Sequence, residues 1–327
     1  MAEHSTIEWT DATWNPITGC SVVSPGCTNC YAMKLAGTRL RNHRSRAGLT
    51  KPTKAGPVWN GVVRLNEGWL KQPMQWKRSR RIFVCAHGDL FHENVPDDWI
   101  DQVFAVMALS SRHTFQILTK RPDRMRDYVS RWFKRLSSLP VMVDHPTGRS
   151  RFSDLVDWAV FPSILPNVWL GVSAERQEEW DQRKDHLRLT PAAVRFASFE
   201  PLLGSIVELN PMSAYLQWAI VGGESGLSSR LMHPSWARSL RDACTKAGVP
   251  FFFKQWGEFF PTDTTLAEFL HQSDDRRIGE RIVGANDFEG FPAHGVERFQ
   301  VMRRLGKTAA GRLLDGVEHN GMPRRAA

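Results

Sequence analysis

Apolar runs, each followed by a polar turn and then by a helix-like segment, recur along the first 256 residues. The runs lie at 13–19, 81–87, 114–118, 167–172, 193–199, 216–221 and 250–253. Strands that are apolar throughout and separated by helices are typical of a parallel sheet that is buried on both faces. The regular length of the strand and helix units favours a barrel over an open doubly wound sheet. We therefore predict an α/β fold, a partial TIM-type parallel (β/α) barrel with about six or seven strands.

Helical patterns fill the segments between these runs. The predicted helices span 33–41, 97–109, 123–136, the region of Trp180, Arg183 and Leu187, and 234–247. Asp97 is placed to cap its helix, because a side-chain oxygen there can accept a hydrogen bond from the first turn. Gly248 is placed to end the last of these helices.

Polar or charged residues follow most of the apolar runs directly. In (β/α) barrels the reactive groups lie at this edge, where strands end and loops begin. The residues at these positions are Asp89, Thr119, Lys120, Ser173, Glu200, Glu224, Lys254 and Gln255. We interpret them as a catalytic rim, and the alternative is that they are ordinary loop residues and helix caps.

A basic insertion interrupts the repeat at residues 37–81. It carries twelve Lys or Arg residues against one acid, Glu67, and three tryptophans lie between them, Trp59, Trp69 and Trp76. Cations with interleaved aromatics suit a nucleic-acid backbone and its bases. The alternatives are a solvated charged face and tryptophans that pack in the core.

The last part of the chain also departs from the repeat. After about residue 257 no strand–helix unit is recognisable until a basic helix predicted at 299–314, which we expect to add Lys307 and Arg312 to an anion site. We predict a barrel domain at 1–256 that includes the insertion, followed by a C-terminal extension or cap at 257–327.

Composition narrows the class of partner. The 327-residue chain has a net charge of +9 and is 42% hydrophobic, which is enough apolar content for a substantial core. A basic balance favours a polyanionic partner such as nucleic acid, although many basic enzymes bind small phosphates. No apolar run reaches 18 residues, so we expect neither a signal peptide nor a membrane span.

Three of the five cysteines, Cys20, Cys27 and Cys30, lie in one segment rich in Gly and Pro. An odd, clustered set argues against a disulfide framework and for a reducing, cytoplasmic setting. Three thiolates leave one coordination position of a metal centre open. A [4Fe–4S] cluster with one open iron fits this set best. Unrelated core thiols and structural zinc are the alternatives, and the candidate fourth ligands for zinc, which are His4, Cys85 and His87, lack finger-like spacing.

The run Asn15-Pro16-x-x-Gly19-Cys20…Cys27-x-x-Cys30-Tyr31-Ala32 resembles the radical S-adenosylmethionine (SAM) superfamily. The most similar branch contains spore photoproduct lyase and related DNA repair lyases, and the chain also resembles a three-cysteine radical-SAM-like family of phage and bacterial genomes. The likeness spans about residues 8–256. Its further motifs are Gly88-Asp89-Leu90-Phe91, Ile117-Leu118-Thr119-Lys120-Arg121, Gly171-Val172-Ser173 and Arg183.

This resemblance implies that the three cysteines hold three irons of a [4Fe–4S] cluster and that the fourth iron chelates SAM. Reductive cleavage of SAM would then give a 5′-deoxyadenosyl radical that abstracts a hydrogen atom from substrate. The residues it assigns to cofactor binding are Tyr31, Asp89, Thr119, Lys120, Ser173 and Arg183. The chain departs from the superfamily in its Cys-x6-Cys-x2-Cys spacing, against the usual Cys-x3-Cys-x2-Cys, and in Asn29, where an aromatic residue is usual.

The remaining polar strand ends supply candidate catalytic groups. These are Cys85, Glu200, Glu224 and Lys254. Cys85 alternates with His87 and Asp89, so all three could face the interior of the barrel, with Cys85 as a hydrogen-atom donor; the alternative is a small apolar filler. Cys244 is expected in a helix core.

We therefore expect a radical-SAM-type iron–sulfur enzyme that acts on nucleic acid or a nucleotide, as a DNA repair lyase or a base-modifying enzyme. DNA is expected more than RNA. A reductase or other electron donor would complete the system, and a partner protein could supply part of the site. The alternatives are a nucleic-acid-binding protein with a structural or redox-sensing cluster, and a radical enzyme that acts on a small anionic metabolite.

Overall fold

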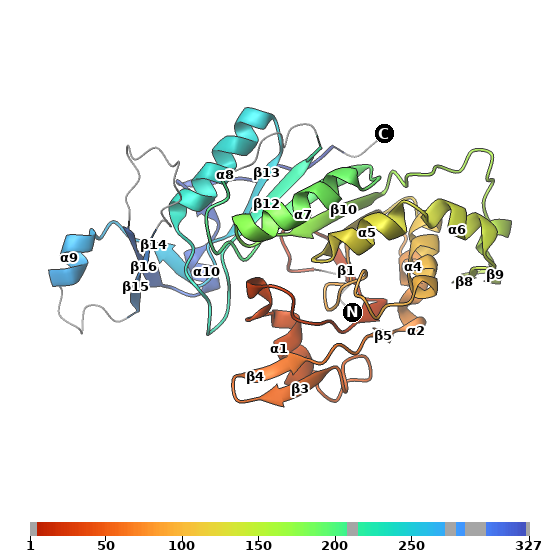
Figure 1. The fold of residues 1–327 in the computed structure, drawn as a ribbon, viewed down its shortest axis with the longest axis horizontal. Helices are drawn as coiled ribbons and strands as arrows, with labels where there is room; N and C mark the ends of the chain where they lie inside the picture. The colour runs from red at the N-terminus through yellow and green to blue at the C-terminus, as the bar shows by residue number, and fades with distance from the viewer. Residues whose placement is uncertain (1–4, 208–214, 272–278, 285–298, 325–327) are drawn as a thin grey trace. The chain divides into compact units, whose positions relative to one another are not determined.

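A computed structural model describes residues 5–207, 215–271, 279–284 and 299–324 (Figure 1). Its main sheet has seven strands in the order β1-β6-β7-β10-β11-β12-β13. The strands are β1 (Ala12–Trp14), β6 (Arg81–Val84), β7 (Thr114–Thr119), β10 (Val168–Ser173), β11 (Val194–Phe199), β12 (Trp218–Gly222) and β13 (Phe251–Gln255). Neighbouring strands follow one another along the chain, as in a (β/α) barrel and unlike a doubly wound sheet, whose order reverses. The predicted partial TIM-type α/β fold is therefore confirmed.

The helices between these strands follow the predicted pattern with shifted ends. They are α4 (Asp97–Leu109), α5 (Pro122–Val129), α6 (Trp132–Ser138), α7 (Gln177–Leu189) and α8 (Pro234–Ala247). Helix α8 has the predicted bounds, and Gly248 ends it in the left-handed conformation with φ 67°. The helix predicted at 123–136 is two helices. Pro96, and not Asp97, occupies the cap position of α4, so Asp97 is the first helical residue.

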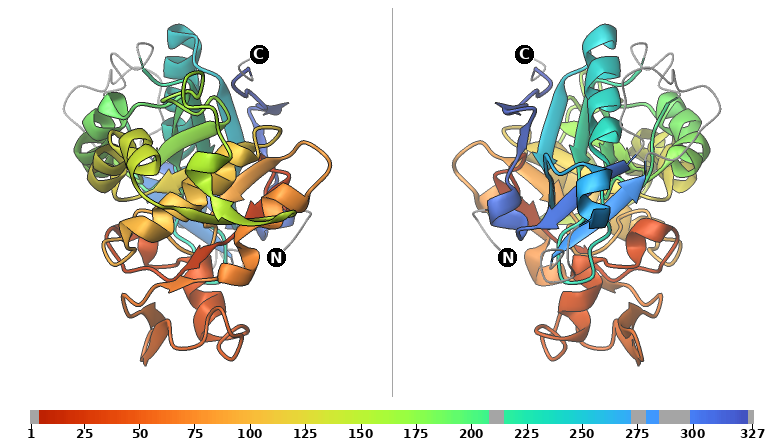
Figure 2. Two further views of the ribbon diagram at one scale, coloured as in Figure 1. Left: turned by 90° about the vertical axis from the view of Figure 1, so that its right-hand side faces the viewer. Right: turned by 90° about the vertical axis from the view of Figure 1, so that its left-hand side faces the viewer.

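The chain divides into two compact units, which are described separately. The first comprises residues 1–172, 183–196 and 324–327, and the second comprises residues 173–182 and 197–323. In the first unit β6 pairs in parallel with β1 and β7, and β7 pairs in parallel with β10. In the second unit β12 pairs in parallel with β13, and α8 packs on both strands (Figure 2). The domain boundary at residue 256 stays a prediction.

The basic insertion folds around an antiparallel hairpin. Its elements are β3 (Thr50–Thr53), β4 (Gly56–Trp59), β5 (Arg64–Leu65), α2 (Glu67–Leu70) and α3 (Gln72–Gln75). The hairpin packs on α1 (Tyr31–Gly37), the helix that follows the cysteine loop, and β5 pairs with β2 (Ile17–Thr18) (Figure 1). Trp59 and Trp76 are 5% and 8% exposed, so these two tryptophans are core residues and cannot stack on bases.

The prediction of a helix at 299–314 is wrong. Residues Phe299–Arg304 form strand β16, the middle strand of an antiparallel sheet between β14 (Phe259–Pro261) and β15 (Glu280–Gly284). Only α10 (Lys307–Ala310) is helical, and a short hairpin of β17 (Leu313–Leu314) and β18 (Val317–Glu318) follows it. The Arg312 guanidinium donates to Asn320 and stacks over Phe252, so it is engaged within the second unit.

The other described elements are short. They are β8 (Met142–His145), β9 (Gly148–Arg151), α9 (Leu266–His271), and single 3-10 turns at Pro25–Cys27 and Phe152–Asp154. Among the described helices, none combines the length and the apolar character needed to cross a bilayer.

Gly171 on β10 offers a test of the packing in the first unit. A Cβ atom at this position would lie 2.6 Å from ring atoms of Phe196. We expect Gly171→Ala to lower the free energy of unfolding by about 1–3 kcal/mol, because the buried ring has to move. Gly68→Ala is the control, since a Cβ there has no neighbour within 4 Å. Urea denaturation measures both, and equal stability of the two variants would contradict the packing described.

Candidate cysteine centre

The cysteine loop begins where β2 meets the turn after β6. Gly19 forms an isolated parallel bridge with Gly88, and its amide donates to the carbonyl of His87 at 3.3 Å. Gly19 has φ 100°, and a Cβ atom there would lie 2.1 Å from the Val62 carbonyl oxygen. Only glycine fits this position. Cys20 therefore leaves the bridge in a fixed direction.

Local hydrogen bonds shape the rest of the loop. Cys27 ends a 3-10 turn and donates its amide to Ser24, and Cys30 donates its amide to Cys27. Cys30 is also the residue before α1, so its thiol is tied to the start of that helix. Each of these two hydrogen bonds joins residues three positions apart. Such short-range bonds fix the shape of the Gly- and Pro-rich loop although it has little regular structure.

An apolar cluster forms the floor under the thiols. Its residues are Ala32, Met33, Ala36, Leu49 and Trp59, and both Cys20 and Cys30 pack against it. All five cysteines of the chain are free thiols. The cluster joins α1 to the hairpin of the insertion, so the insertion supports the cysteine loop directly.

Asp89 connects the end of β6 to the end of β7. Its buried carboxylate accepts from the Thr119 hydroxyl at 2.7 Å, from the Lys120 amide at 3.2 Å and from the Arg121 guanidinium at 3.0 Å. It also accepts from the amide of Phe91 at 3.0 Å. Asp89 and Thr119 thus use their side chains within the protein, and their contact with a cofactor stays a prediction. The hydrogen bonds of Asp89 hold Lys120 and Arg121 at the cysteine loop.

Lys120 reaches Cys27 through Ser24. Its ammonium donates to the Ser24 hydroxyl at 3.1 Å, and that hydroxyl lies 3.8 Å from the sulfur of Cys27. Burial alone would raise the pKa of the Cys27 thiol, but the ammonium of Lys120 and the amides of Val23 and Ser24 lower it below its ordinary value. Arg183 also lies close enough to lower the pKa of Lys120, after the larger effect of burial.

Arg121 is a site residue that the sequence interpretation missed. Its guanidinium lies 3.7 Å from the sulfur of Cys20 and donates to Ser21 at 2.6 Å and to Glu93 at 2.5 Å. Burial opposes the charge, but Asp89 and Glu93 raise the pKa of Arg121 above its ordinary value. The sequence feature that could have identified Arg121 is its position directly after Lys120 at the end of β7. No sequence pattern pointed to Glu93, because it lies in an irregular segment.

The other two thiols are protonated in the metal-free protein. Burial, followed by the charge of Asp89, raises the pKa of Cys20 to about 12, and burial also raises that of Cys30. Electrostatic interaction with Cys27 and Cys30 raises the pKa of Cys20 further, so the three cysteines lie within electrostatic reach of one another.

These residues fit an iron–sulfur cluster by their chemistry. Cluster thiolates bind different irons, so the sulfurs need to face one space without meeting at one atom. Cys20 and Cys30 pack on one apolar cluster and both interact electrostatically with Cys27, and two cations, Lys120 and Arg121, lie near Cys27 and Cys20 to offset negative charge. Within the described residues, no three His, Cys, Asp or Glu side chains converge closely enough to surround one metal ion. His4, a candidate ligand for zinc, lies outside the described residues.

A second group of side chains begins at Tyr31, the residue after Cys30. Tyr31 donates its hydroxyl to the carbonyl of Ala86 at 2.5 Å, and its ring meets His87 edge to face at 5.6 Å. The amide of His87 donates to the side chain of Asn15 at 3.0 Å, which gives the Asn-Pro motif a structural role. Cys85 lies beyond the end of β6 with φ 57°, so the predicted alternation of Cys85, His87 and Asp89 along a strand is wrong. Burial raises the pKa of the Cys85 thiol to about 12, so the thiol is neutral, and its role as a hydrogen-atom donor stays a prediction.

The remaining candidates belong to the second unit. Lys254 donates to Glu200 at 2.7 Å, and Gln255 donates to the same oxygen at 3.3 Å. Glu224 instead accepts two bonds from the Arg230 guanidinium, at 2.6 and 2.9 Å, and one from the Arg230 amide at 2.8 Å. Glu200 and Lys254 are thus brought together, and Glu224 is paired with another partner. Ser173 is buried at the end of β10. Catalytic or cofactor roles for these four residues stay predictions.

Comparison with known proteins places the chain in a family. A family model described as a protein of unknown function, DUF5131, matches residues 4–323, so the chain belongs to this family. No curated protein and no solved structure matches it.

Lys120 gives a direct test of the electrostatics at Cys27. We expect Lys120→Met to raise the pKa of Cys27 by about 1–3 units, because burial is then no longer opposed by a cation. The thiolate absorbance of the metal-free protein, followed in the ultraviolet against pH and corrected with Cys27→Ser, should rise at higher pH in the variant. Lys34→Met is the matched control, since Lys34 bonds to Asn29 at 3.3 Å. Superimposable titrations of wild type and Lys120→Met would refute the pairing.

Proposed function

We propose that this protein is a [4Fe–4S] enzyme of radical-SAM type that acts on nucleic acid or a nucleotide. The observation that carries the proposal is the three-thiol loop with Lys120 and Arg121 held against it by Asp89. The resemblance of the cysteine motif to the radical SAM superfamily supports the same chemistry. Modification or repair of DNA, and dependence on a reductase, are parts of the proposal.

Cys20, Cys27 and Cys30 would hold the cluster, which when bound supplies an electron for the reductive cleavage of SAM. The protein's own part is electrostatic. Lys120 lowers the pKa of Cys27 and so favours the thiolate that a metal needs. Arg121 points a guanidinium at the sulfur of Cys20, and a donor at a ligating sulfur is one of the ways a protein tunes a cluster.

The insertion supports the choice of a polyanionic substrate. Residues 12–66 contain no Asp or Glu. Five exposed cations of the insertion make no ion pair with any described residue, namely Arg39, Arg41, Arg44, Lys51 and Lys54. Elsewhere in the first unit, exposed arginines such as Arg149 pair with carboxylates. Unpaired cations on a surface without acids suit phosphates, whose counter-ions they displace.

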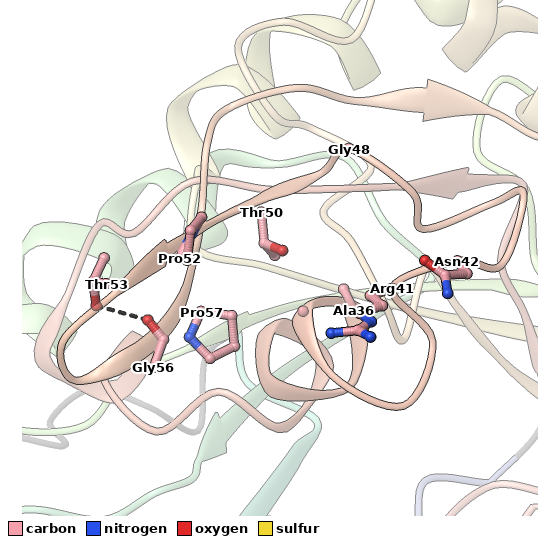
Figure 3. A pocket seen from close by; sticks show the side chains of 10 residues that line it. Ala36, Arg41, Asn42, Gly48, Thr50, Pro52, Thr53, Gly56 and Pro57 are labelled. Atoms are coloured by element: carbon pink, nitrogen blue, oxygen red, sulfur yellow. Dashed lines mark hydrogen bonds between the residues drawn. The ribbon is translucent and has the colours of Figure 1, made fainter.

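A cavity of about 460 Å³ opens beside one of these cations, Arg41 (Figure 3). It lies between the end of α1, the following loop and the hairpin β3–β4, and its lining includes Arg41, Asn42 and Thr50 but no acid. Its size is within the range of small-ligand sites. A nucleotide unit of the substrate could enter it while neighbouring phosphates contact the exposed cations.

The decisive experiment is anaerobic reconstitution with iron and sulfide, followed by incubation with SAM and dithionite. The wild type should become brown and release 5′-deoxyadenosine, whereas Cys27→Ala should release none above the level without protein. Cys244→Ala is the matched control, because Cys244 is a buried helix residue outside the loop. A colourless wild type that contains zinc would contradict the proposed iron–sulfur cluster. A brown protein that leaves SAM intact but binds nucleic acid would favour a structural or redox-sensing cluster.

The nucleic-acid part has its own test. Binding of a single-stranded oligonucleotide should weaken with salt, and Arg39→Ala with Arg44→Ala should reduce the slope of log affinity against log salt by about 1.4, or about 0.7 for each phosphate that is no longer neutralised. The matched control removes two exposed cations outside the insertion, by Arg112→Ala with Lys134→Ala. Fluorescence anisotropy measures both. Affinity that does not depend on salt would point to a small anionic metabolite as the substrate.

A further inference from the structure

Arg46 is the one cation of the loop between α1 and β3 that is buried. Its residue is 4% exposed, and only Nη1 has partners, which are the carbonyl of Ser45 at 3.2 Å and the Ser45 hydroxyl at 2.8 Å. Its Nε is buried with no hydrogen-bond partner, and no carboxylate among the described residues pairs with it. A buried guanidinium without a counter-ion is unfavourable, because two hydrogen bonds from one nitrogen do not replace the water that the other nitrogens and the charge have lost.

The protein holds this cation in place. The carbonyl of Ser45 accepts from Thr18 at 2.7 Å, and the Ser45 hydroxyl lies 2.7 Å from His43. Burial lowers the pKa of Arg46 to about 10, so the guanidinium still carries its charge at neutral pH. Thr18 is two residues before Cys20, which fixes Arg46 relative to the cysteine loop.

A second unpartnered nitrogen lies in the same environment. The Nδ1 atom of His87 is buried without a hydrogen-bond partner, and Arg46 is one cause of the low pKa of that ring, after burial. Tyr31 and Cys85 also interact electrostatically with Arg46, as does Arg64, a second cation. Arg64 is fixed by bonds to the carbonyls of Arg44 and Ala47, both at 2.7 Å. The group is thus rich in N–H donors and positive charge.

We propose that Arg46 and His87 form a binding site for a phosphate group of the substrate. Nε and Nη2 form one edge of the guanidinium, which matches two oxygens of an oxyanion, and His87 can donate to a third. Phosphate suits the site better than a carboxylate, because a second cation lies near and the unpaired cations of the insertion continue along the same loop. That the phosphate belongs to the substrate rests on the proposed function. Tyr31 joins the site to Cys30, so the phosphate would lie next to the cysteine centre.

The test uses the full chain without cluster or SAM, with inorganic phosphate as the probe and chloride at equal ionic strength as the reference. Phosphate should raise the Tm of the wild type more than chloride does. Arg46→Met should start with a higher Tm, because the unpaired buried charge is gone, and should bind phosphate at least tenfold more weakly by calorimetry. Arg112→Met, an exposed arginine outside the insertion, should behave as the wild type.

A second variant guards against misfolding. Arg46→Lys keeps the charge but not the two-pronged donor, so it should fold and bind phosphate with intermediate affinity. Competition identifies the source of the phosphate: displacement by a short single-stranded oligonucleotide supports the nucleic-acid backbone, and displacement by a nucleoside monophosphate alone supports a free nucleotide. Equal effects of phosphate and chloride on the wild type, or unchanged phosphate binding in Arg46→Met, would overturn the site. Because no arm needs the cluster, loss of SAM cleavage would leave this result intact, and the reverse also holds.

Discussion

The carboxylate of Asp89 is the constraint on which the cysteine centre depends. It accepts four hydrogen bonds at the point where two neighbouring strands end, and three of the donors are consecutive residues of one strand end. Through it, Thr119 and the two cations that follow are tied to the end of β6. A buried carboxylate is stable here because Arg121 neutralises it and backbone amides complete its hydrogen bonding. The strand edge therefore supplies charged side chains that act on the sulfurs, in addition to the amides of the loop.

Positive charge is used in two different ways in the first unit. Arg121, Arg124 and Arg135 are paired with carboxylates and hold elements together. Arg39, Arg41, Arg44, Lys51 and Lys54 of the insertion have no such partners within the described chain, and they lie in residues 12–66, which contain no Asp or Glu. Paired charges fix geometry, whereas unpaired charges attract anions from solution. The insertion both supports the thiols from below and carries this unpaired charge, which connects the proposed substrate surface to the proposed cofactor.

Periodicity was enough to predict the fold class and most elements, because buried parallel strands and amphipathic helices have strong patterns. It failed at residues 299–304, where basic residues next to apolar ones suggested a helix but pairing on both edges makes a strand. The three cysteines were singled out as candidate ligands from their clustering and spacing, and that role stays a prediction. Arg46, Arg121 and Glu93 were not singled out, because their importance comes from burial and from partners at least 28 residues away in the case of Arg121. Sequence pattern shows which residues could react, and only the fold shows which charges remain unpaired.

The apolar cluster that packs on Cys20 and Cys30 bears on how the proposed iron–sulfur cluster would be inserted. In zinc fingers the ligands come together only when the metal binds, so loading and folding are one event. Here the residues that pack on the two thiols are Ala32, Met33, Ala36, Leu49 and Trp59, all within about forty positions of Cys20 and none of them a metal ligand. The thiols are thus brought together by side chains that need no metal. Under the proposed function, the cluster would therefore be delivered to a loop that is already folded, and its removal by a chelator would leave the fold intact.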